Sequence, residues 1–339
     1  MKWKKQLICI LSGGAMVLFM LDSKTALQSG IEGVQLCLQT VIPSLFPFFI
    51  LSLLLTDNLP TPRRTAPSRL ERFLRLPAGS GMLVITGILG GYPVGAKVVG
   101  QSHCAGRLTK AQAQRMTVLC NAPGPAFLFG MVGSILGNLW AVWILWCHIL
   151  LSAILCALII PAQTGSRCAL PDRAPVSIQA ALGKAIPMMA SVCSWIVLFR
   201  ILTGYLQKWM PDTVAPSLQS LLFGLLELSN GIVSLRAISD PGVSFLLCSF
   251  LLPMGGVCVW MQTASVFREL SMKLYLLAKL FQSSVCFLLS SGVLMLLPGL
   301  RTNPLPGWVP VLATATAAAS GLYLRNIVKI SRFSGVIGV

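Results

Sequence analysis

The longest charge-free stretch of the chain restricts its fold more than any other feature. No Asp, Glu, Lys or Arg occurs from Met116 to Ile160. A segment of that length has no charged face to present to water, so its natural solvent is a lipid bilayer. Only 10% of all residues are charged, against about 25% in a typical soluble domain, and the mean hydropathy is +0.80. The sequence therefore predicts an all-α polytopic membrane protein.

Apolar segments long enough to cross the bilayer set the expected number of spans. A helix needs roughly 17–25 residues to cross a hydrocarbon core about 30 Å thick. About eight segments meet this requirement: 5–22, 31–55, 116–137, 139–161, 178–204, 243–267, 273–298 and 307–325. Two further apolar segments, 82–100 and 218–236, are interrupted near their middles by Gly, Pro, Asn or Glu. These two are either spans or re-entrant hairpins, which enter and leave on the same side.

The distribution of Lys and Arg favours the re-entrant interpretation. The net charge is +17, but the basic residues lie mostly in short loops between apolar segments, so nucleic acid is not an expected partner. With a cytoplasmic N-terminus and two re-entrant hairpins, most of these charges lie inside, including Arg63, Arg64, Arg167 and Arg173. The bias is weaker if both segments span. We therefore expect a multi-pass protein of the cell membrane with both termini in the cytoplasm.

Under this topology the two halves have the same order of elements in opposite orientations. Each half has a helix containing Ile-Pro, a hairpin, a helix broken by Pro and Gly, and a final helix. Inverted repeats with matched broken helices are typical of secondary transporters, whereas scattered Gly and Pro are simply tolerated in membrane helices. The expected organisation is an N-terminal helix (1–30), a first repeat (31–161), a second inverted repeat (178–298), and a C-terminal helix and tail (299–339).

Other classes of protein have little support in the sequence. The 11 cysteines form no CxxC pair and the two histidines stand apart, so neither a metal site nor a disulfide framework is expected. No HExxH, GxSxG or phosphate-binding loop is present, so we do not expect an enzyme. The basic start and apolar stretch up to Leu21 resemble a signal peptide, but no small-x-small cleavage site follows. We expect a retained first helix.

Glu227 is the candidate carboxylate for a functional site. It lies in the middle of an apolar segment, where a carboxylate costs several kcal/mol unless it is paired, protonated or hydrated. Its expected role is protonation or binding of a coupling Na⁺ or H⁺. The alternative is a structural Glu neutralised by a neighbouring Arg or by backbone groups. Ser229 and Asn230 stand at the expected hairpin tip, where their oxygens either face a ligand or serve ordinary turn chemistry.

The first hairpin supplies two further candidates. Lys97 either pairs with a carboxylate of the substrate or extends to the cytoplasmic surface. Tyr92 either stacks on an aromatic substrate or anchors the membrane interface.

The broken helices supply three more candidates, all with polar side chains. Asn121 precedes Pro123 and Pro125, which lack N–H groups and leave carbonyls of the preceding turn free for a ligand. Gln262 and Thr263 follow the second break in the equivalent way. Alternatively, these amides and the hydroxyl join helices to one another.

Four motifs carry a resemblance to a known family. They are GYPVGAK at 91–97, CNAPGPAFLFG at 120–130, GLLELSNG at 224–231 and GGVCVWMQ at 255–262. The chain resembles the YlbJ-type sporulation integral membrane proteins over roughly residues 30–300. These proteins carry the nucleoside-recognition Gate domain, which they share with concentrative nucleoside transporters. The resemblance implies two inverted units of hairpin and broken helix, and dipicolinate export during sporulation. The first hairpin lacks the polar and acidic residues of the nucleoside transporters.

These features together predict a transporter that works by alternating access. Its site is expected midway through the membrane, between the two hairpins and the two broken helices. The first substrate hypothesis is a small organic anion, with dipicolinate ahead of a nucleoside. A non-transporting membrane scaffold for spore-envelope assembly is the alternative from another class. The sequence leaves the coupling ion and the oligomeric state open.

Overall fold

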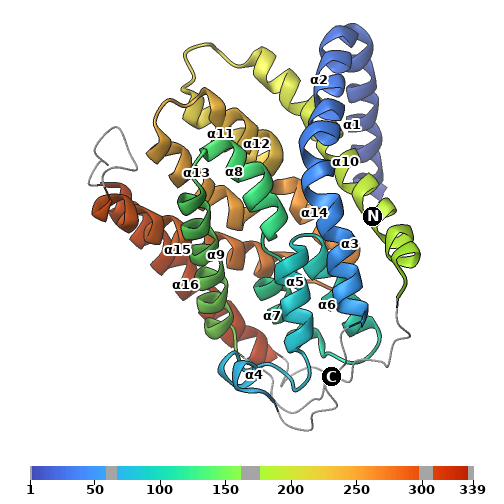
Figure 1. The fold of residues 1–339 in the computed structure, drawn as a ribbon. Coiled ribbons are helices and arrows are strands. Elements are labelled where there is room, and N and C mark those ends of the chain that lie inside the picture. Colours follow the sequence, from blue (N-terminus) through green and yellow to red (C-terminus); the bar gives the residue numbers. More distant parts are fainter. Residues whose placement is uncertain (1, 59–66, 162–175, 298–307, 335–339) are drawn as a thin grey trace.

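The computed structural model describes residues 2–58, 67–161, 176–297 and 308–334, and every regular element in them is a helix. Figure 1 shows several long helices, with shorter helices between them. The arginines expected in inside loops at 63, 64, 167 and 173 lie outside the described residues. The cytoplasmic placement of the termini therefore stays a prediction.

The first half of the chain begins with two paired helices. Helix α1 (Lys2–Leu21) turns at Asp22, whose side chain accepts a hydrogen bond from Thr25 N and so caps α2 (Ser23–Leu36). A π-helical turn, η1 (Cys37–Val41), continues α2 into α3 (Ile42–Asn58). This irregular turn ends two residues before Pro43, which has no N–H to offer the carbonyl four residues earlier. The predicted segment 31–55 is therefore the second part of a longer helix.

The rest of the first half alternates short and long helices. After α4 (Arg69–Phe73), a tight turn joins α5 (Gly81–Gly90) to α6 (Val94–Cys104). The predicted segment 116–137 is α7 (Lys110–Cys120), a break at residues 121–125, then η2 (Ala126–Val132) and α8 (Gly133–Leu136). Helix α9 (Leu139–Ile159) completes this half, with its N-terminus capped by Asn138.

The second half follows the same order. The long helix α10 (Ile178–Trp209) precedes a pair of short helices, α11 (Pro216–Leu226) and α12 (Leu228–Ser234). After a 3-10 turn, η3 (Leu235–Ala237), come α13 (Pro241–Met254) and α14 (Gly256–Val266), which are separated by a break at Gly255. Helix α15 (Met272–Leu296) completes the half, and α16 (Trp308–Ser334) packs against it.

The two pairs of short helices lie at different ends of the molecule. In Figure 1, α5 and α6 lie in the lower part with α7, whereas α11 and α12 lie in the upper part. The arms of each pair pack against each other, α5 on α6 and α11 on α12. Each interrupted segment is thus a helical hairpin in the fold. Their re-entrance into a membrane, and the inversion of the two halves across it, stay predictions.

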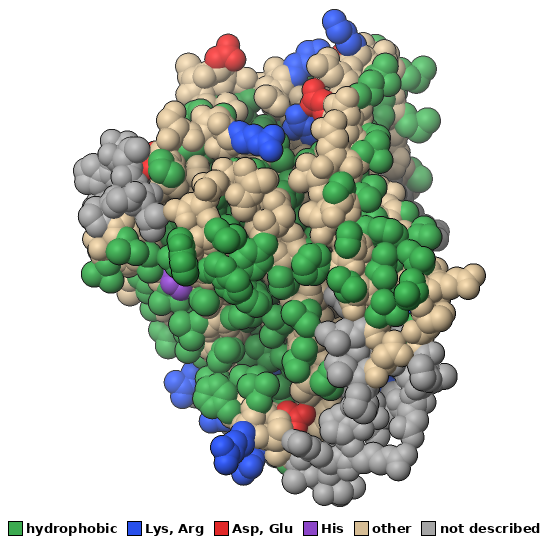
Figure 2. Space-filling view, viewed as in Figure 1, with side chains coloured by type: hydrophobic (Ala, Val, Ile, Leu, Met, Phe, Trp, Pro, Cys, Tyr) green, Lys and Arg blue, Asp and Glu red, His purple; other side chains and the backbone are tan. Residues whose placement is uncertain are grey.

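Length and composition support a multi-pass membrane protein. In the part of the chain that the structure describes, five helices are long and apolar enough to cross a bilayer: Ser23–Leu51, Leu139–Ile159, Ile178–Trp209, Pro241–Val266 and Met272–Leu296. Figure 2 shows apolar side chains over the middle of the molecule, with Lys, Arg, Asp and Glu towards its two ends. Large apolar side chains such as Leu27, Leu202 and Leu312 are exposed. A lipid environment accounts for such a surface.

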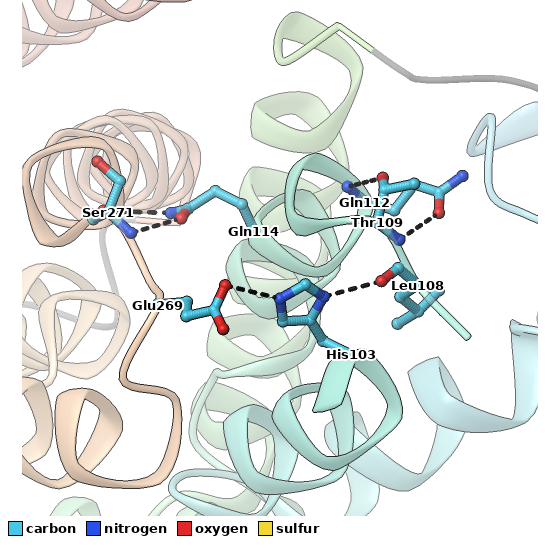
Figure 3. Close-up of polar contacts among 7 residues, drawn as sticks. All are labelled: His103, Leu108, Thr109, Gln112, Gln114, Glu269 and Ser271. Atoms are coloured by element: carbon cyan, nitrogen blue, oxygen red, sulfur yellow. Dashed lines mark hydrogen bonds and ion pairs between the residues drawn. The ribbon is translucent and has the colours of Figure 1, made fainter. Parts of the chain in front are cut away.

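A polar contact ties the end of the first hairpin to the loop between α14 and α15 (Figure 3). His103 at the end of α6 lies 2.8 Å from Leu108 O through Nδ1 and 3.0 Å from Glu269 Oε2 through Nε2. Beside it, Gln114 of α7 accepts from Ser271 N and donates to Ser271 O. The Leu108 carbonyl and the Glu269 carboxylate raise the pKa of His103, and the hydrogen bond from His103 lowers the pKa of Glu269. The charged form of His103 is therefore favoured in the folded protein.

This contact predicts a pH dependence of stability with a definite sign. The folded protein holds the His103 proton more tightly than the unfolded chain, whose His pKa is about 6.5. Stability from this contact is complete below that value and falls as pH rises through the raised pKa of His103. We expect the thermal unfolding midpoint to decrease over this range in the wild type and to decrease less in His103→Gln. Identical profiles for the two proteins would contradict the assignment. Glu269→Gln, which keeps the Leu108 contact, should fall between them.

Candidate functional site

A cavity lies between the tips of the two hairpins, the first break and helix α14. Its interior volume is about 40 Å³, which in this conformation is room for water and not for an organic solute. Helices α3 and α10 close its sides, and both hairpin tips, the first break and α14 contribute to its wall. The lining residues are Leu45, Phe48, Phe49, Gly90, Tyr92, Gly124, Ala126, Phe127, Val192, Ile196, Glu227, Leu228, Ser229, Val259 and Gln262. This is the place where the sequence predicts a site.

Backbone contact between glycines positions the first hairpin against the first break. Gly91, at the hairpin turn, has a φ of +65°, and a Cβ there would lie 2.4 Å from Gly124 N. A Cβ on Gly95 would lie 2.5 Å from Cys120 O. Real Cβ atoms do not approach backbone atoms so closely, so side chains are excluded at both positions. The hairpin tip and the break therefore pack as one unit.

The second half uses the same kind of contact. A Cβ on Gly231 of α12 would lie 2.2 Å from Gly224 Cα of α11, so the two arms of this hairpin touch through their backbones. A Cβ on Gly256, at the second break, would lie 2.6 Å from Gly224 O. Gly255 and Gly256 both have positive φ values, which glycine adopts without strain. The second hairpin and the second break are thus also joined backbone to backbone.

Glu227 faces the cavity and also caps a helix. Its Oε1 accepts from Ser229 N at 3.0 Å and its Oε2 accepts from Asn230 N at 2.7 Å, so the carboxylate satisfies the first N–H groups of α12. The residue is 3% exposed. The backbone neutralisation that the sequence left as an alternative is therefore present. It does not exclude a role in the cavity, since Glu227 is also part of the cavity wall.

The first break is held by a polar cluster that extends into the second half. Pro123 and Pro125 supply no N–H to Leu119 O and Asn121 O, the carbonyls four residues before them. Lys279 of α15 donates to Asn121 O at 2.5 Å and to Gln282 Oε1 at 2.9 Å, and Gln282 Nε2 donates to Val118 O at 2.9 Å. Side chains of α15 thus satisfy carbonyls that the break leaves free.

The Asn121 side chain extends the same cluster. Asn121 Nδ2 lies 2.8 Å from Thr263 Oγ1 of α14 and 2.7 Å from the Tyr275 hydroxyl of α15. All three of these residues are fully buried. The amide therefore joins the first break to helices of the second half, which is the helix-joining role that the sequence left open for Asn121 and Thr263.

The predicted site residues divide into three groups. Tyr92, Glu227, Ser229 and Gln262 line the cavity. Asn121 and Thr263 belong to the polar cluster beside it, and Asn230 donates its N–H to Glu227 at the hairpin tip. Lys97 is half-buried on α6 and is not part of the cavity wall. The Tyr92 hydroxyl lies 3.5 Å from Leu252 O, across from the first hairpin to α13.

Two basic residues have environments that the sequence did not indicate. Arg200 Nη2 lies 2.6 Å from Glu32 Oε2 and pairs α10 with α2. Arg115 is buried and donates to Ala157 O and Ile160 O at the C-terminal end of α9. Positive charge at a helix C-terminus is favourable.

Sequence reasoning also passed over Lys279. It is 1% exposed and lies about two turns from the N-terminus of α15, one of the helices able to cross a membrane. A signal was present, because an ionisable residue inside an apolar segment is a functional candidate, the rule that selected Glu227.

Comparison with known proteins finds a related sequence over a limited region of the chain. A stretch of 104 residues is 33% identical to the sporulation integral membrane protein YlbJ of Bacillus subtilis. The stretch is 30% of this chain and spans only 25% of that relative's length. No family model and no solved structure matches the chain, so the Gate domain stays a prediction. The chain is a multi-pass membrane protein whose regular elements, in the described residues, are all helices, and it is related over part of its length to a sporulation integral membrane protein.

Proposed function

We propose that the chain is a membrane transporter that moves a small organic solute by alternating access. The observation that carries this proposal is the composition of the cavity wall, in which both hairpin tips, the first break and helix α14, which follows the second break, take part. Ligand sites of secondary transporters form where discontinuous helices of two repeats meet. Non-helical backbone at membrane depth is tolerated where it is buried in protein or faces such a cavity.

The glycine contacts support movement of whole units. Each hairpin is joined to the break of its own half by close backbone contacts, as at Gly91 with Gly124 and at Gly224 with Gly256. Between the halves, side-chain hydrogen bonds such as Asn121 with Thr263 accompany buried apolar packing, as in the cluster that contains Leu119 and Phe281. The backbone contacts within each half allow a hairpin and its break to move together as one body against this packing. Such a shift opens the cavity to one side and then to the other.

The cavity wall favours a substrate with a planar ring. Phe48, Phe49, Phe127 and Tyr92 supply aromatic faces, and Ser229 and Gln262 supply polar groups that orient a ligand. Dipicolinate and nucleosides both contain such a ring. The choice of an anion rests on the family resemblance of the sequence motifs alone, because Lys97 does not line the cavity and Glu227 does. Dipicolinate stays the first substrate and a nucleoside the second.

Transport assays in proteoliposomes test this proposal directly. We expect saturable flux of labelled dipicolinate or uridine in the wild type, and a loss of about tenfold or more in Glu227→Gln. The matched control is Asp240→Asn, because Asp240 caps α13 through Gly242 N in the same manner but lies outside the cavity wall. Its flux should match that of the wild type.

The scaffold alternative makes a different forecast for the same variants. The capping role of Glu227 is the observation that favours it. A scaffold requires folded protein but no flux, so neither solute would move and Glu227→Gln would leave spore-envelope assembly intact. Correctly folded wild-type protein that carries neither solute would overturn both named substrates.

A further inference from the structure

The buried ammonium group of Lys279 has no carboxylate partner among the described residues. The helices that pack against α15 are α7, α9, α13, α14 and α16, and neither they nor α15 contain Asp or Glu. The titratable groups that face Lys279 are Tyr275 on its own helix, with the ring centroid 5.5 Å from Nζ, Cys120 of α7 and Cys156 of α9. These groups are neutral near pH 7 at their ordinary pKa values. The surroundings therefore supply dipoles and no counter-ion.

Oxygen atoms take the place of a counter-ion. The Nζ atom lies between Asn121 O, which Pro125 deprives of its helical partner, and Gln282 Oε1. Two more polar atoms close by in the chain, Asn121 Oδ1 and Ser283 Oγ, are buried without a partner in the structure. Ser283 stands one helical turn from Lys279. Free carbonyls at a broken helix are the groups that bind coupling cations in transporters, and here they hold an ammonium group.

The ammonium group is linked to the cavity by two short paths. Asn121 accepts from Lys279, and Gly124, three residues further along the same break, lines the cavity. Asn121 also bonds to Thr263, whose neighbour Gln262 lines the cavity. A change in the bonding of Nζ therefore acts on the backbone and side chains that form the cavity wall. The two sites are placed for thermodynamic coupling, in which each alters the affinity of the other.

We infer that Lys279 is the coupling-ion site of this protein, with its own ammonium group in the cation position and its proton as the ion exchanged. This inference rests on the proposed transport function and names its coupling ion. In one step the ammonium group releases one proton to water on the open side and becomes a neutral amine. In the return step the amine takes one proton from water on the other side. Charge balances, and no Na⁺ is required.

Two transport assays distinguish proton exchange at Lys279 from a purely structural role of this residue. Accumulation driven by a pH gradient requires proton exchange, whereas solute–solute exchange requires only the cavity. With dipicolinate and uridine as probes, we expect Lys279→Met to keep exchange and to lose accumulation by about tenfold or more, a change in the usual range of coupling between sites. Lys273→Met is the matched control, because Lys273 is exposed on the same helix. It should retain both modes.

Arginine at position 279 provides the sharper test. Arg keeps the positive charge but does not release its proton at accessible pH. Lys279→Arg should therefore lack accumulation while retaining exchange. Recovery of accumulation in Lys279→Arg would show that the charge alone matters and would overturn the inference. A parallel loss of both modes in the Met and Arg variants, or wild-type accumulation driven by Na⁺ and not by protons, would also overturn it.

If the protein carries neither dipicolinate nor uridine, that result counts against the proposed transport function alone. The cation site at Lys279 can still be tested by thermal unfolding, which requires no solute. In Lys279→Ala the oxygens of Asn121 and Gln282 lose their cation, so we expect NaCl to raise the thermal unfolding midpoint above that in an equal concentration of choline chloride. The wild type should show no difference between the two salts. Equal midpoints for the variant would refute a cation site at this position.

Discussion

The Gly231→Ala variant is expected to be less stable than the wild type by about 3 kcal/mol, the upper end of the range for overpacking in a close-packed interior. The added methyl would lie 2.2 Å from Gly224 Cα, 2.4 Å from Gly224 N and 2.9 Å from Ser220 O. All three atoms belong to the backbone of α11, so no side-chain rotation relieves the contact. The two arms of the hairpin must separate, and the cap that Glu227 provides at their junction is displaced with them.

Reversible unfolding in mixed micelles measures this loss, and Gly183→Ala is the matched control. Gly183 also lies inside a helix, α10, but no atom lies within 4 Å of the position that its Cβ would take. Alanine there should stabilise the helix by up to about 1 kcal/mol, because glycine has the lower helix propensity. The two substitutions should therefore change stability in opposite directions. Similar changes for both would mean that the arms do not pack through their backbones.

Close glycine contacts between hairpin and break occur in both halves, and they help to explain why both halves tolerate interrupted helices. A broken helix leaves carbonyl and N–H groups without intrahelical partners, and these must be satisfied inside the protein. In the first half Lys279 and Gln282 satisfy carbonyls of the break. In the second half Trp260 Nε1 donates to Met254 O at 2.7 Å. The close approach of the hairpin in each half then covers another part of the break with backbone atoms.

Much of this fold could be predicted from hydropathy and helix-breaking residues. The long apolar segment 139–161 corresponds to α9 because the run contains no Gly or Pro that would end it before Pro161. The turns at Tyr92-Pro93 and at Glu227 were predictable as interruptions. The number of spans was less accessible: about eight were expected, and five described helices satisfy the length criterion. A helix broken in its middle consists of two short pieces, and their placement in a bilayer depends on packing that hydropathy does not describe.

For the site, too, the sequence indicated polar residues inside apolar segments, but which of them meet the cavity depends on packing. Glu227 was selected because a carboxylate inside an apolar segment is costly, and it lies in the cavity wall. Lys97 was selected for its charge near a hairpin tip, but which face of α6 meets the cavity depends on how Gly91 and Gly95 pack on the break. Lys279 lies in an otherwise regular helix. Its importance follows from contact with Asn121, which is 158 residues away in the sequence.

The Asn121→Leu variant is expected to lose about 1–3 kcal/mol of stability, because it removes two interhelical hydrogen bonds of a kind worth about 0.6–1.7 kcal/mol each in membrane proteins. Leucine has a similar size but leaves the Thr263 and Tyr275 hydroxyls without this partner. Ser284→Ala is the control, since the buried Ser284 hydroxyl bonds only to Leu280 O within α15. Its effect should be small.

A double-mutant cycle with Thr263→Val isolates the contact between the two halves. If the Asn121–Thr263 hydrogen bond joins them, the double variant should be more stable than the sum of the single losses predicts, by about 1 kcal/mol. The same cycle with Ser284→Ala should be additive. Additivity in both cycles would mean that Asn121 acts only through its own half. Coupling in the Thr263 cycle alone would place a measurable link between the first break and α14, the link through which a change at Lys279 reaches Gln262 in the cavity wall.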